Sequence, residues 1–246
     1  MKRRYRWHPD VPDHRDQMFM VGPTPIPQDV DLRDRCPPIF DQQSLGSCTA
    51  QALAFALQYN EQQDHQACTE IPSRLFIYYC ERAKDGTINE DAGSSLRTGI
   101  KCVNKTGAPP ESLWPYDEDH FSDKPPIEAW AAARYYRAIR YARVGQAKSL
   151  MLQCLGQGLP FICGIPVYES FESDDVRASG MVPMPGDDEA MVGGHAVSIV
   201  GFRSADKTWI GRNSWGRAWG DRGYFYLPEA YLLTLGRDFW VVRKVT

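Results

Sequence analysis

The sequence predicts an α+β fold with two subdomains, on the basis of three observations. Helical apolar periodicity occupies the first half of the chain, strand-like apolar runs occupy the second half, and a Pro- and Asp-rich stretch from Trp114 to Pro126 separates them. Helices that precede strands in this way favour segregated structure over alternating βαβ units. We expect a mainly helical subdomain over about 37–130 and a mainly β subdomain over about 135–240.

Size and charge limit the class of protein. A chain of 246 residues with 43% hydrophobic and 24% charged residues is ordinary for a globular protein with a sizeable core. The formal net charge is −3, so nothing predicts a nucleic-acid partner or attraction to anionic membranes. No apolar run approaches the ~18–20 residues that span a bilayer, so no membrane partner is expected.

Residues 1–29 are predicted to form an extended arm that precedes a domain over 30–246. The segment contains five prolines and has no helical periodicity. Its first ten residues are charged but are not followed by an apolar stretch, so they do not resemble a signal peptide. We therefore expect a cytoplasmic protein, or a secreted one if an export signal precedes this sequence.

The expected helices follow from apolar spacing and from helix-start residues. Ala50, Leu53, Ala54 and Leu57 recur at i, i+3, i+4 and i+7 and predict a helix from Cys48 to about Gln62. Ser73 after Pro72 opens a second helix. A third helix contains Leu96, Ile100 and Val103 and is closed by the Gly-Ala-Pro-Pro run at 107–110, and a further helix spans the apolar residues 147–155.

The second half of the chain predicts strands. One short strand is expected within 30–47, and later apolar runs predict five more. These runs are Phe161–Val167, His195–Phe202, Thr208–Asn213, Gly223–Leu227 and Asp238–Val245.

Cys48 differs from the other six cysteines in its position. The odd count leaves at least one thiol free if the rest pair within the chain, and the absence of any C-x-x-C pair argues against a structural zinc site. The cysteines at positions 80, 102, 154 and 163 fall in apolar patterns and are interpreted as small buried hydrophobic residues. Cys36 and Cys68 lie in loop-like sequence, and the sequence leaves open whether they form a disulfide with each other.

Three motifs supply a nucleophile, a base and an orienting group. The run DQQSLGSC at 41–48 leads directly into a helix, whose N-terminal N–H groups and dipole favour a thiolate at Cys48. GGHAV at 193–197 places His195 at the entry to a strand. NSWGRAWG at 213–220 places Asn213 at the end of the next strand. A cysteine followed far downstream by His and Asn is typical of nucleophilic acyl transfer.

With these motifs the chain resembles the papain family of cysteine peptidases over roughly Val30 to Thr246, and most of all its short bacterial members, which also read D-Q-x-x-L-G-S-C-T-A. The resemblance implies a papain-like fold with the nucleophile at a helix N-terminus in the helical subdomain. His195 and Asn213 would then belong to an antiparallel β subdomain.

The resemblance also implies roles for individual residues. Cys48 matches the nucleophile, His195 the general acid/base and Asn213 the residue that holds the imidazole. Gln42 matches the side-chain donor of the oxyanion hole, with the Cys48 amide as the second donor. The resemblance also implies substrate-binding residues. Trp215 would shield the Asn–His hydrogen bond, and Trp219 would form the floor of the site on the leaving-group side. Gly93 and Gly194 would lie beside the substrate backbone.

The chain departs from the family pattern at two positions beside the nucleophile. Leu45 stands where most members have a cysteine, so the usual bridge from that position is absent. Thr49 stands where most members have a tryptophan. A long helical propeptide is also missing, since only about thirty residues precede Val30.

The predicted function is hydrolysis of peptide bonds in peptide or protein substrates through a Cys48 thioester, without metal or organic cofactor. We expect a thiolate–imidazolium pair and endopeptidase action. The alternatives are an acyl transferase or peptide ligase on the same site, or an inactive papain-fold binding module. The arm is expected to dock in or near the groove between the subdomains, around Asp16–Pro27, as a regulatory latch, or to pack outside it as a strap.

Overall fold

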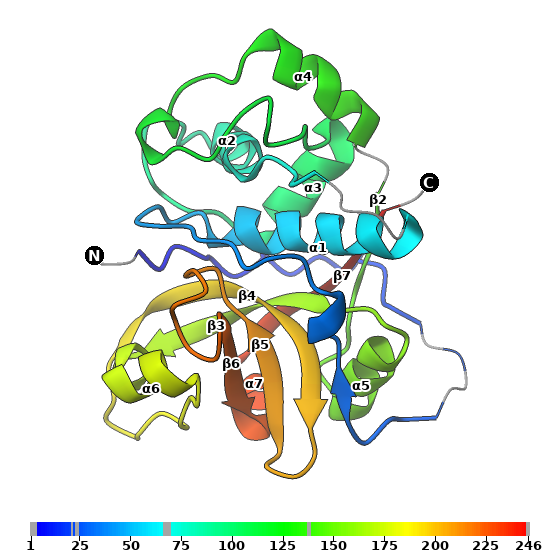
Figure 1. Cartoon of the computed structure of the whole chain (residues 1–246), viewed down its shortest axis with the longest axis vertical. Helices are drawn as coiled ribbons and strands as arrows, with labels where there is room; N and C mark the ends of the chain where they lie inside the picture. The colour runs from blue at the N-terminus through cyan, green and yellow to red at the C-terminus, as the bar shows by residue number, and fades with distance from the viewer. Residues whose placement is uncertain (1–3, 21, 23–24, 66–69, 137–138, 245–246) are drawn as a thin grey trace.

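The computed structural model describes residues 4–20, 22, 25–65, 70–136 and 139–244. Within these ranges the chain folds into a helical part on one side and an antiparallel sheet with further helices around it on the other, and the N-terminal arm runs between the two parts (Figure 1). The predicted α+β class is confirmed. Cys68 lies outside the described residues, as does the end of the strand expected to reach Val245.

The helices of seven or more residues are α1 (Cys48–His65), α2 (Arg74–Asp85), α3 (Leu96–Thr106), α4 (Ile127–Ala133), α5 (Lys148–Gly156) and α7 (Glu229–Leu235). A shorter helix, α6, spans Asp174–Ser179, and 3-10 turns span Arg33–Arg35, Glu118–His120, Arg134–Tyr136 and Glu169–Glu172. The strands are β1 (Val30–Asp31), β2 (Ile139–Arg143), β3 (Phe161–Tyr168), β4 (Met191–Arg203), β5 (Thr208–Arg212), β6 (Tyr224–Pro228) and β7 (Arg237–Lys244).

Capping explains where two of the predicted helices begin. The Ser73 side chain accepts a hydrogen bond from the Phe76 amide at the start of α2. Ser95 does the same for the Thr98 amide at the start of α3. Each hydroxyl satisfies an N–H group that the first turn of a helix leaves without a partner. Helix α2 ends at Gly86, whose φ of 77° lies in the left-handed region that favours glycine.

The sheet places the predicted base and its orienting residue on neighbouring strands. Its strand order is β2-β7-β3-β4-β5-β6, and β1 pairs with β4 outside this path. Strand β4 carries His195, and Asn213 follows the last residue of β5. These strands are antiparallel neighbours, with Ser198 opposite Arg212. The register therefore brings the start of β4 to the end of β5, so the two side chains meet.

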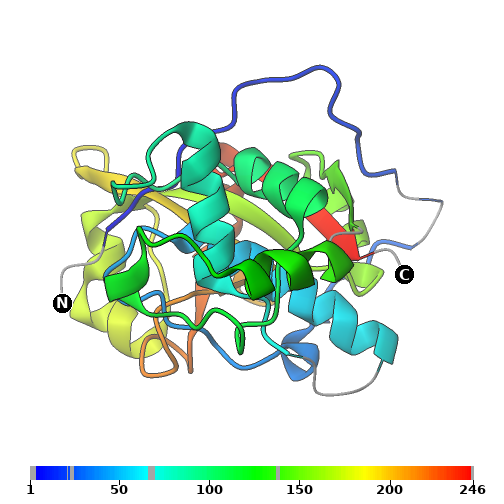
Figure 2. The same cartoon turned by 90° about the horizontal axis from the view of Figure 1, so that it is seen from above.

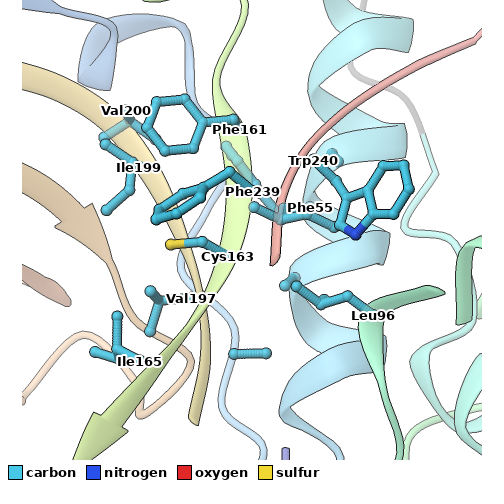
Figure 3. Close-up of a cluster of buried hydrophobic side chains, with 14 of the residues drawn as sticks. Phe55, Leu96, Phe161, Cys163, Ile165, Val197, Ile199, Val200, Phe239 and Trp240 are labelled. Atoms are coloured by element: carbon cyan, nitrogen blue, oxygen red, sulfur yellow. The ribbon is translucent and has the colours of Figure 1, made fainter. Parts of the chain in front are cut away.

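The core between α1 and the sheet fixes the nucleophile relative to these strands. Figure 3 shows Phe55 from α1 and Leu96 from α3 on the same side as Trp240 of β7, with further apolar side chains of β3 and β4, such as Phe161 and Ile199, toward the other side. All of these side chains are buried. Because protein interiors are close-packed, this contact leaves little freedom for α1 to shift against the sheet.

A buried ion cluster attaches the arm to both sides of the molecule. Asp10 accepts hydrogen bonds from the Arg97 amide of α3, at 2.9 Å, and from Arg143 of β2, at 3.0 Å. Asp16 pairs with the same two arginine side chains, and Arg143 also binds Asp238 of β7 at 3.1 Å. Seen from above, the arm crosses the molecule between the helices and the sheet and then arches over α3 and β7 (Figure 2).

Elements that the sequence pattern did not predict are short. Helices α4, α6 and α7 have seven residues or fewer, and β2 lies at the edge of the sheet. Short elements show less than two full periods of apolar spacing, so tertiary contacts decide their conformation. None of the helices in the described ranges is long and apolar enough to cross a membrane.

Candidate active site

Cys48 is the first residue of α1 and is fully buried. The helix begins there because the Ser47 carbonyl accepts the Gln51 amide at 3.0 Å, and the Ser47 hydroxyl lies 2.7 Å from the Tyr116 hydroxyl. Burial raises the pKa of the Cys48 thiol to about 12, although hydrogen bonds from the Ala196, Arg6 and Thr49 amides oppose this rise. Three elements therefore aim N–H groups at the sulfur: β4, the arm and α1.

His195 and Asn213 form the second part of the site. Nε2 of His195 lies 2.9 Å from Oδ1 of Asn213, and both side chains are buried. The same Oδ1 accepts the Ser214 amide at 2.8 Å, which fixes the orientation of the Asn213 side chain. An amide oxygen only accepts, so Nε2 of His195 carries the proton in this bond. The other ring nitrogen, Nδ1, is therefore the one that would exchange a proton with a thiol.

Two tryptophans enclose this pair. The ring of Trp215 stacks on His195, with centroids 5.0 Å apart and an interplanar angle of 29°. Trp219 packs edge-on against Trp215 at 4.9 Å and stacks on Phe171 at 5.7 Å. Both indoles are buried, so Trp215 keeps bulk water from the hydrogen bond between His195 and Asn213, and Trp219 packs against Trp215. A shielded hydrogen bond is stronger than an exposed one.

Gln42 lies just before α1, with its backbone and side chain both anchored. Its amide donates to the Ser214 carbonyl at 2.9 Å, its Oε1 accepts from the Ser214 hydroxyl at 2.7 Å, and its Nε2 donates to the Leu45 carbonyl at 2.8 Å. A side-chain amide nitrogen has two N–H groups, so one can still serve a substrate oxygen. The oxyanion role of Gln42 stays a prediction, and its placement agrees with that role.

The arm pairs with backbone on both sides of Cys48. The Trp7 amide donates to the Gly194 carbonyl at 3.0 Å, on the β side. On the helical side, the Ser94 amide donates to the Arg6 carbonyl at 3.2 Å, and the His8 amide donates to the Ser94 carbonyl at 3.0 Å. We call the backbone of residues 92–94 and 193–194 the arm-binding site. The ring of Tyr5 packs edge-on against the ring of His195, with the ring centroids 6.1 Å apart.

Gly93 and Gly194, the predicted substrate-binding glycines, both lie in the arm-binding site. A Cβ on Gly93 would come within 1.9 Å of the Arg6 carbonyl oxygen, and one on Gly194 within 2.5 Å of the Trp7 carbonyl oxygen. Both positions therefore need glycine while a chain lies along this site. The helical-side backbone bonds come from Ser94, which the sequence did not single out, because backbone donors and acceptors carry no residue-specific signal.

The expectation for the latch is that residues around Asp16–Pro27 lie across or beside the groove between the subdomains; residues 21, 23 and 24 of this segment lie outside the described residues. Beside Cys48 itself, the part of the arm that pairs with the backbone is Tyr5–His8. Residues 17–19 instead run beside β2, where the Phe19 amide donates to the Arg143 carbonyl at 2.7 Å. The difference follows from apolar burial, since the Trp7 side chain is 6% exposed, whereas Met18 and Met20 stay exposed.

The thiolate–imidazolium pair expected from the sequence does not fit the structure with the arm in place. A thiol whose pKa is raised to about 12 is neutral at physiological pH. The physical cause is the desolvation of a fully buried sulfur, which disfavours the charged form. The helix N-terminus favours the thiolate as expected, but with the arm bound its contribution is smaller than that of burial.

Burial raises the thiol pKa of the other described cysteines as well. All are free thiols, and those at positions 80, 102, 154 and 163 are buried, as predicted. Burial raises the pKa of Cys36 to about 11 and that of Cys154 to about 12. Among the described residues, no group of three or more His, Cys, Asp or Glu side chains could hold a metal ion.

Comparison with known proteins identifies relatives over nearly the whole chain. The family model described as papain family cysteine protease matches residues 26–232. An uncharacterized peptidase C1-like protein of Acanthamoeba polyphaga mimivirus is 45% identical over 216 residues, which are 84% of this chain and 70% of that protein.

Solved structures show the same similarity. Xylellain, a cysteine protease from Xylella fastidiosa, is 37% identical with a TM-score of 0.91, and the match covers 100% of this chain and 99% of that one. The bromelain protease from Ananas comosus is 18% identical with a TM-score of 0.67, over 89% of this chain and 100% of that chain. At that identity the second match supports the fold alone.

Proposed function

The chain belongs to the papain family of cysteine peptidases, and from this premise we propose that it is an endopeptidase closed by its own arm. A peptidase of this family is a hydrolase that cleaves peptide bonds. Two finer points are our proposal: that cleavage occurs within a chain rather than at its ends, and that residues 5–8 block the site until they leave it.

The path of the arm supports endopeptidase action. An extended segment pairs with residues on both sides of Cys48 and continues in both directions, to Arg4 beside Asp91 and to Asp10 in the ion cluster. A site that holds an extended chain running on past both ends can also hold the interior of a substrate. An exopeptidase instead needs a group that stops the chain and binds its terminal charge.

The contacts of the arm explain why it blocks the site without being cut. The backbone group that meets the Cys48 sulfur is the Arg6 amide, a hydrogen-bond donor. The Arg6 carbonyl accepts from the Ser94 amide. A thiolate attacks a carbonyl carbon, whereas the group that this pose directs at the sulfur is an N–H donor.

The reaction follows once the arm has left. Water then reaches the site, the desolvation of Cys48 falls, and the thiol passes its proton to Nδ1 of His195. The thiolate attacks the substrate carbonyl, and the Cys48 amide and Gln42 Nε2 bind the oxyanion. His195 protonates the leaving amine, then takes a proton from the water that hydrolyses the thioester, which frees the acid and the thiol. Asn213 holds the imidazole throughout.

The test is cleavage of an internally quenched peptide whose two termini are blocked, with products identified by mass spectrometry. We expect cuts inside the peptide, and none with Cys48→Ala, which keeps a good helix former at the start of α1. Activity only on free peptide ends would contradict endopeptidase action. Transfer of the acyl group to an added amine in place of water would instead indicate a ligase.

A folded chain without any turnover of peptides would indicate a binding module. The full chain bearing Trp7→Ala is measured in parallel, since the arm covers the wild-type site. Labelling of Cys48 by an epoxysuccinyl thiol inhibitor, also read by mass spectrometry, reports separately whether the nucleophile is competent.

A further inference from the structure

Thr49, the residue directly after the nucleophile, binds a carboxyl group in the interior. Its hydroxyl donates to Oε2 of Glu81, in α2, at 2.8 Å. Both side chains are fully buried. Position 49 is also where the sequence departs from the common family pattern. A threonine at this position gives the residue after Cys48 a hydroxyl group that can form a hydrogen bond. A tryptophan would present mainly apolar ring surface instead.

The rest of the Glu81 carboxyl lies among apolar atoms. Its Oε1 is buried and has no hydrogen-bond partner among the described residues. A Cβ on Gly99 of α3 would come within 2.2 Å of this oxygen and 2.4 Å of a Leu53 methyl group. Because Gly99 has no side chain, there is room for the Glu81 carboxyl between α1, α2 and α3.

No cation neutralises this carboxyl within the described part of the chain. The adjacent Arg82 turns away, donating to the Ile88 and Phe121 carbonyls over the Tyr78 ring. The charged and titratable groups that interact electrostatically with Glu81 are Arg82 and Asp85 on α2, with thiols at Cys48 on α1, Cys80 on α2 and Cys102 on α3.

Glu81 is therefore an acid that is hard to ionise. Burial raises its pKa to about 8, and the Thr49 hydrogen bond and Arg82 only partly oppose the rise, to which Asp85 adds. The carboxyl is neutral at neutral pH and becomes charged in mildly alkaline solution. A negative charge on Glu81 raises the pKa of Cys48. The interior between the two groups screens that interaction poorly.

We propose that Glu81, held by Thr49, is a positioning residue that limits formation of the Cys48 thiolate in alkaline solution. The Thr49 hydroxyl holds Glu81 against the first turn of α1, at the residue next to Cys48, so a negative charge on one group makes loss of a proton by the other harder. The neutral acid leaves the thiolate free to form, whereas the carboxylate opposes it. This inference rests on the proposed role of Cys48 as the nucleophile.

The test measures alkylation of Cys48 by iodoacetamide in the full chain, with the modified residue identified by mass spectrometry. The rate is compared between wild type and Glu81→Gln, an uncharged variant of nearly the same shape, at pH 6 and pH 9. Opening of the arm limits access in both proteins equally, so it cancels in the ratio of their rates. Alkylation does not depend on peptide turnover, so the result stands apart from the test of the proposed function.

We expect the variant-to-wild-type ratio to rise by about threefold or more from pH 6 to pH 9, because only wild-type Glu81 acquires a charge in that interval. Glu128→Gln, which removes an exposed carboxylate on α4, is the matched control and should show a constant ratio. The same ratio at both pH values for folded Glu81→Gln would overturn the proposal, since a merely structural residue changes both rates alike.

Variants at Thr49 decide the question independently. Thr49→Val removes the one hydrogen bond that the Glu81 carboxyl accepts within the described ranges, so the carboxyl ionises at higher pH and the ratio should again rise at pH 9. Thr49→Ser keeps the hydroxyl and should restore the wild-type profile. If Glu81→Gln does not fold, a flat profile for Thr49→Val is enough to reject the proposal.

Discussion

The amide of Trp7 donates to the carbonyl of Gly194, the residue before His195, at 3.0 Å. One strand of the sheet, β4, thus carries the predicted catalytic base and also pairs with the arm beside it. The Trp7 side chain packs so closely that a Cβ on Gly164 of β3 would lie 2.0 Å from its ring. The arm is held by backbone pairing on both sides and by one large apolar side chain.

Trp7→Ala should therefore open the site. Truncating a large buried aromatic side chain costs ~3–5 kcal/mol in a packed core. If the state with the arm bound loses only part of this free energy, the fraction of molecules in that state still falls. We therefore expect kcat/KM on a small fluorogenic peptide to rise by about tenfold or more. Met20→Ala, which truncates an exposed apolar residue of the same arm, is the control and should have no effect. Unchanged activity of a folded Trp7→Ala would mean that the arm is a strap.

The site was predictable from sequence because its chemistry is carried by side chains of unusual type in a fixed order. The combination of Cys48 at a predicted helix start, His195 and Asn213 at predicted strand ends, and a preceding Gln42 has no simple packing explanation. The structure brings His195 and Asn213 into hydrogen-bond contact and places Cys48 beside the amide that follows His195. The long helices and strands were predictable for a related reason, since several periods of apolar spacing determine them.

The register of the arm and the buried acid were not predictable. Backbone groups that pair the arm are common to every residue, and apolar side chains occur in both Tyr5–His8 and Asp16–Pro27. Which of these side chains is buried, Trp7 and not Met18 or Met20, is decided by the fold. Glu81 lies in a helix whose buried residues include arginines as well, and a glutamate in such a helix is ordinarily taken to face solvent. Its burial depends on space at Gly99 and on Thr49, both distant in sequence.

Asn213→Ala should lower kcat by about 100-fold with little change in KM, because the imidazole loses its orienting oxygen while the groups that transfer protons remain. Asn213→Asp keeps an oxygen acceptor at the same position and should recover part of the rate. Both variants are compared by steady-state kinetics in the same full-chain background. An alanine variant that retains full kcat would show that Trp215 and the backbone alone orient His195.

Gln42→Ala should lower kcat by ~10²–10³-fold, the usual loss for one oxyanion donor. Its control is Ser214→Ala, which removes the hydrogen bond to Gln42 Oε1, at 2.7 Å, but keeps the Nε2 donor. That variant should lose much less activity. Equal losses in the two variants would assign Gln42 a structural role in the loop before α1 and place the oxyanion donors elsewhere.

The dependence of stability on pH should report the buried state of Glu81. Its pKa rises from an ordinary 4.5 to about 8 on folding, so between these values the folded chain binds a proton that the unfolded chain has lost. The free energy of unfolding contributed by this group therefore falls as pH rises through that window, by up to ~1.4 kcal/mol per pH unit, and levels off above pH 8.

Glu81→Gln cannot lose a proton and lacks this decline. Its free energy of unfolding relative to wild type should therefore increase steadily from pH 5 to pH 8, as measured by urea denaturation at several pH values. Glu128→Gln removes an exposed carboxylate and should follow the wild-type curve. Parallel curves for wild type and Glu81→Gln across this range would mean that Glu81 is already ionised in the folded chain at pH 5, with a counter-charge or solvent reaching its Oε1.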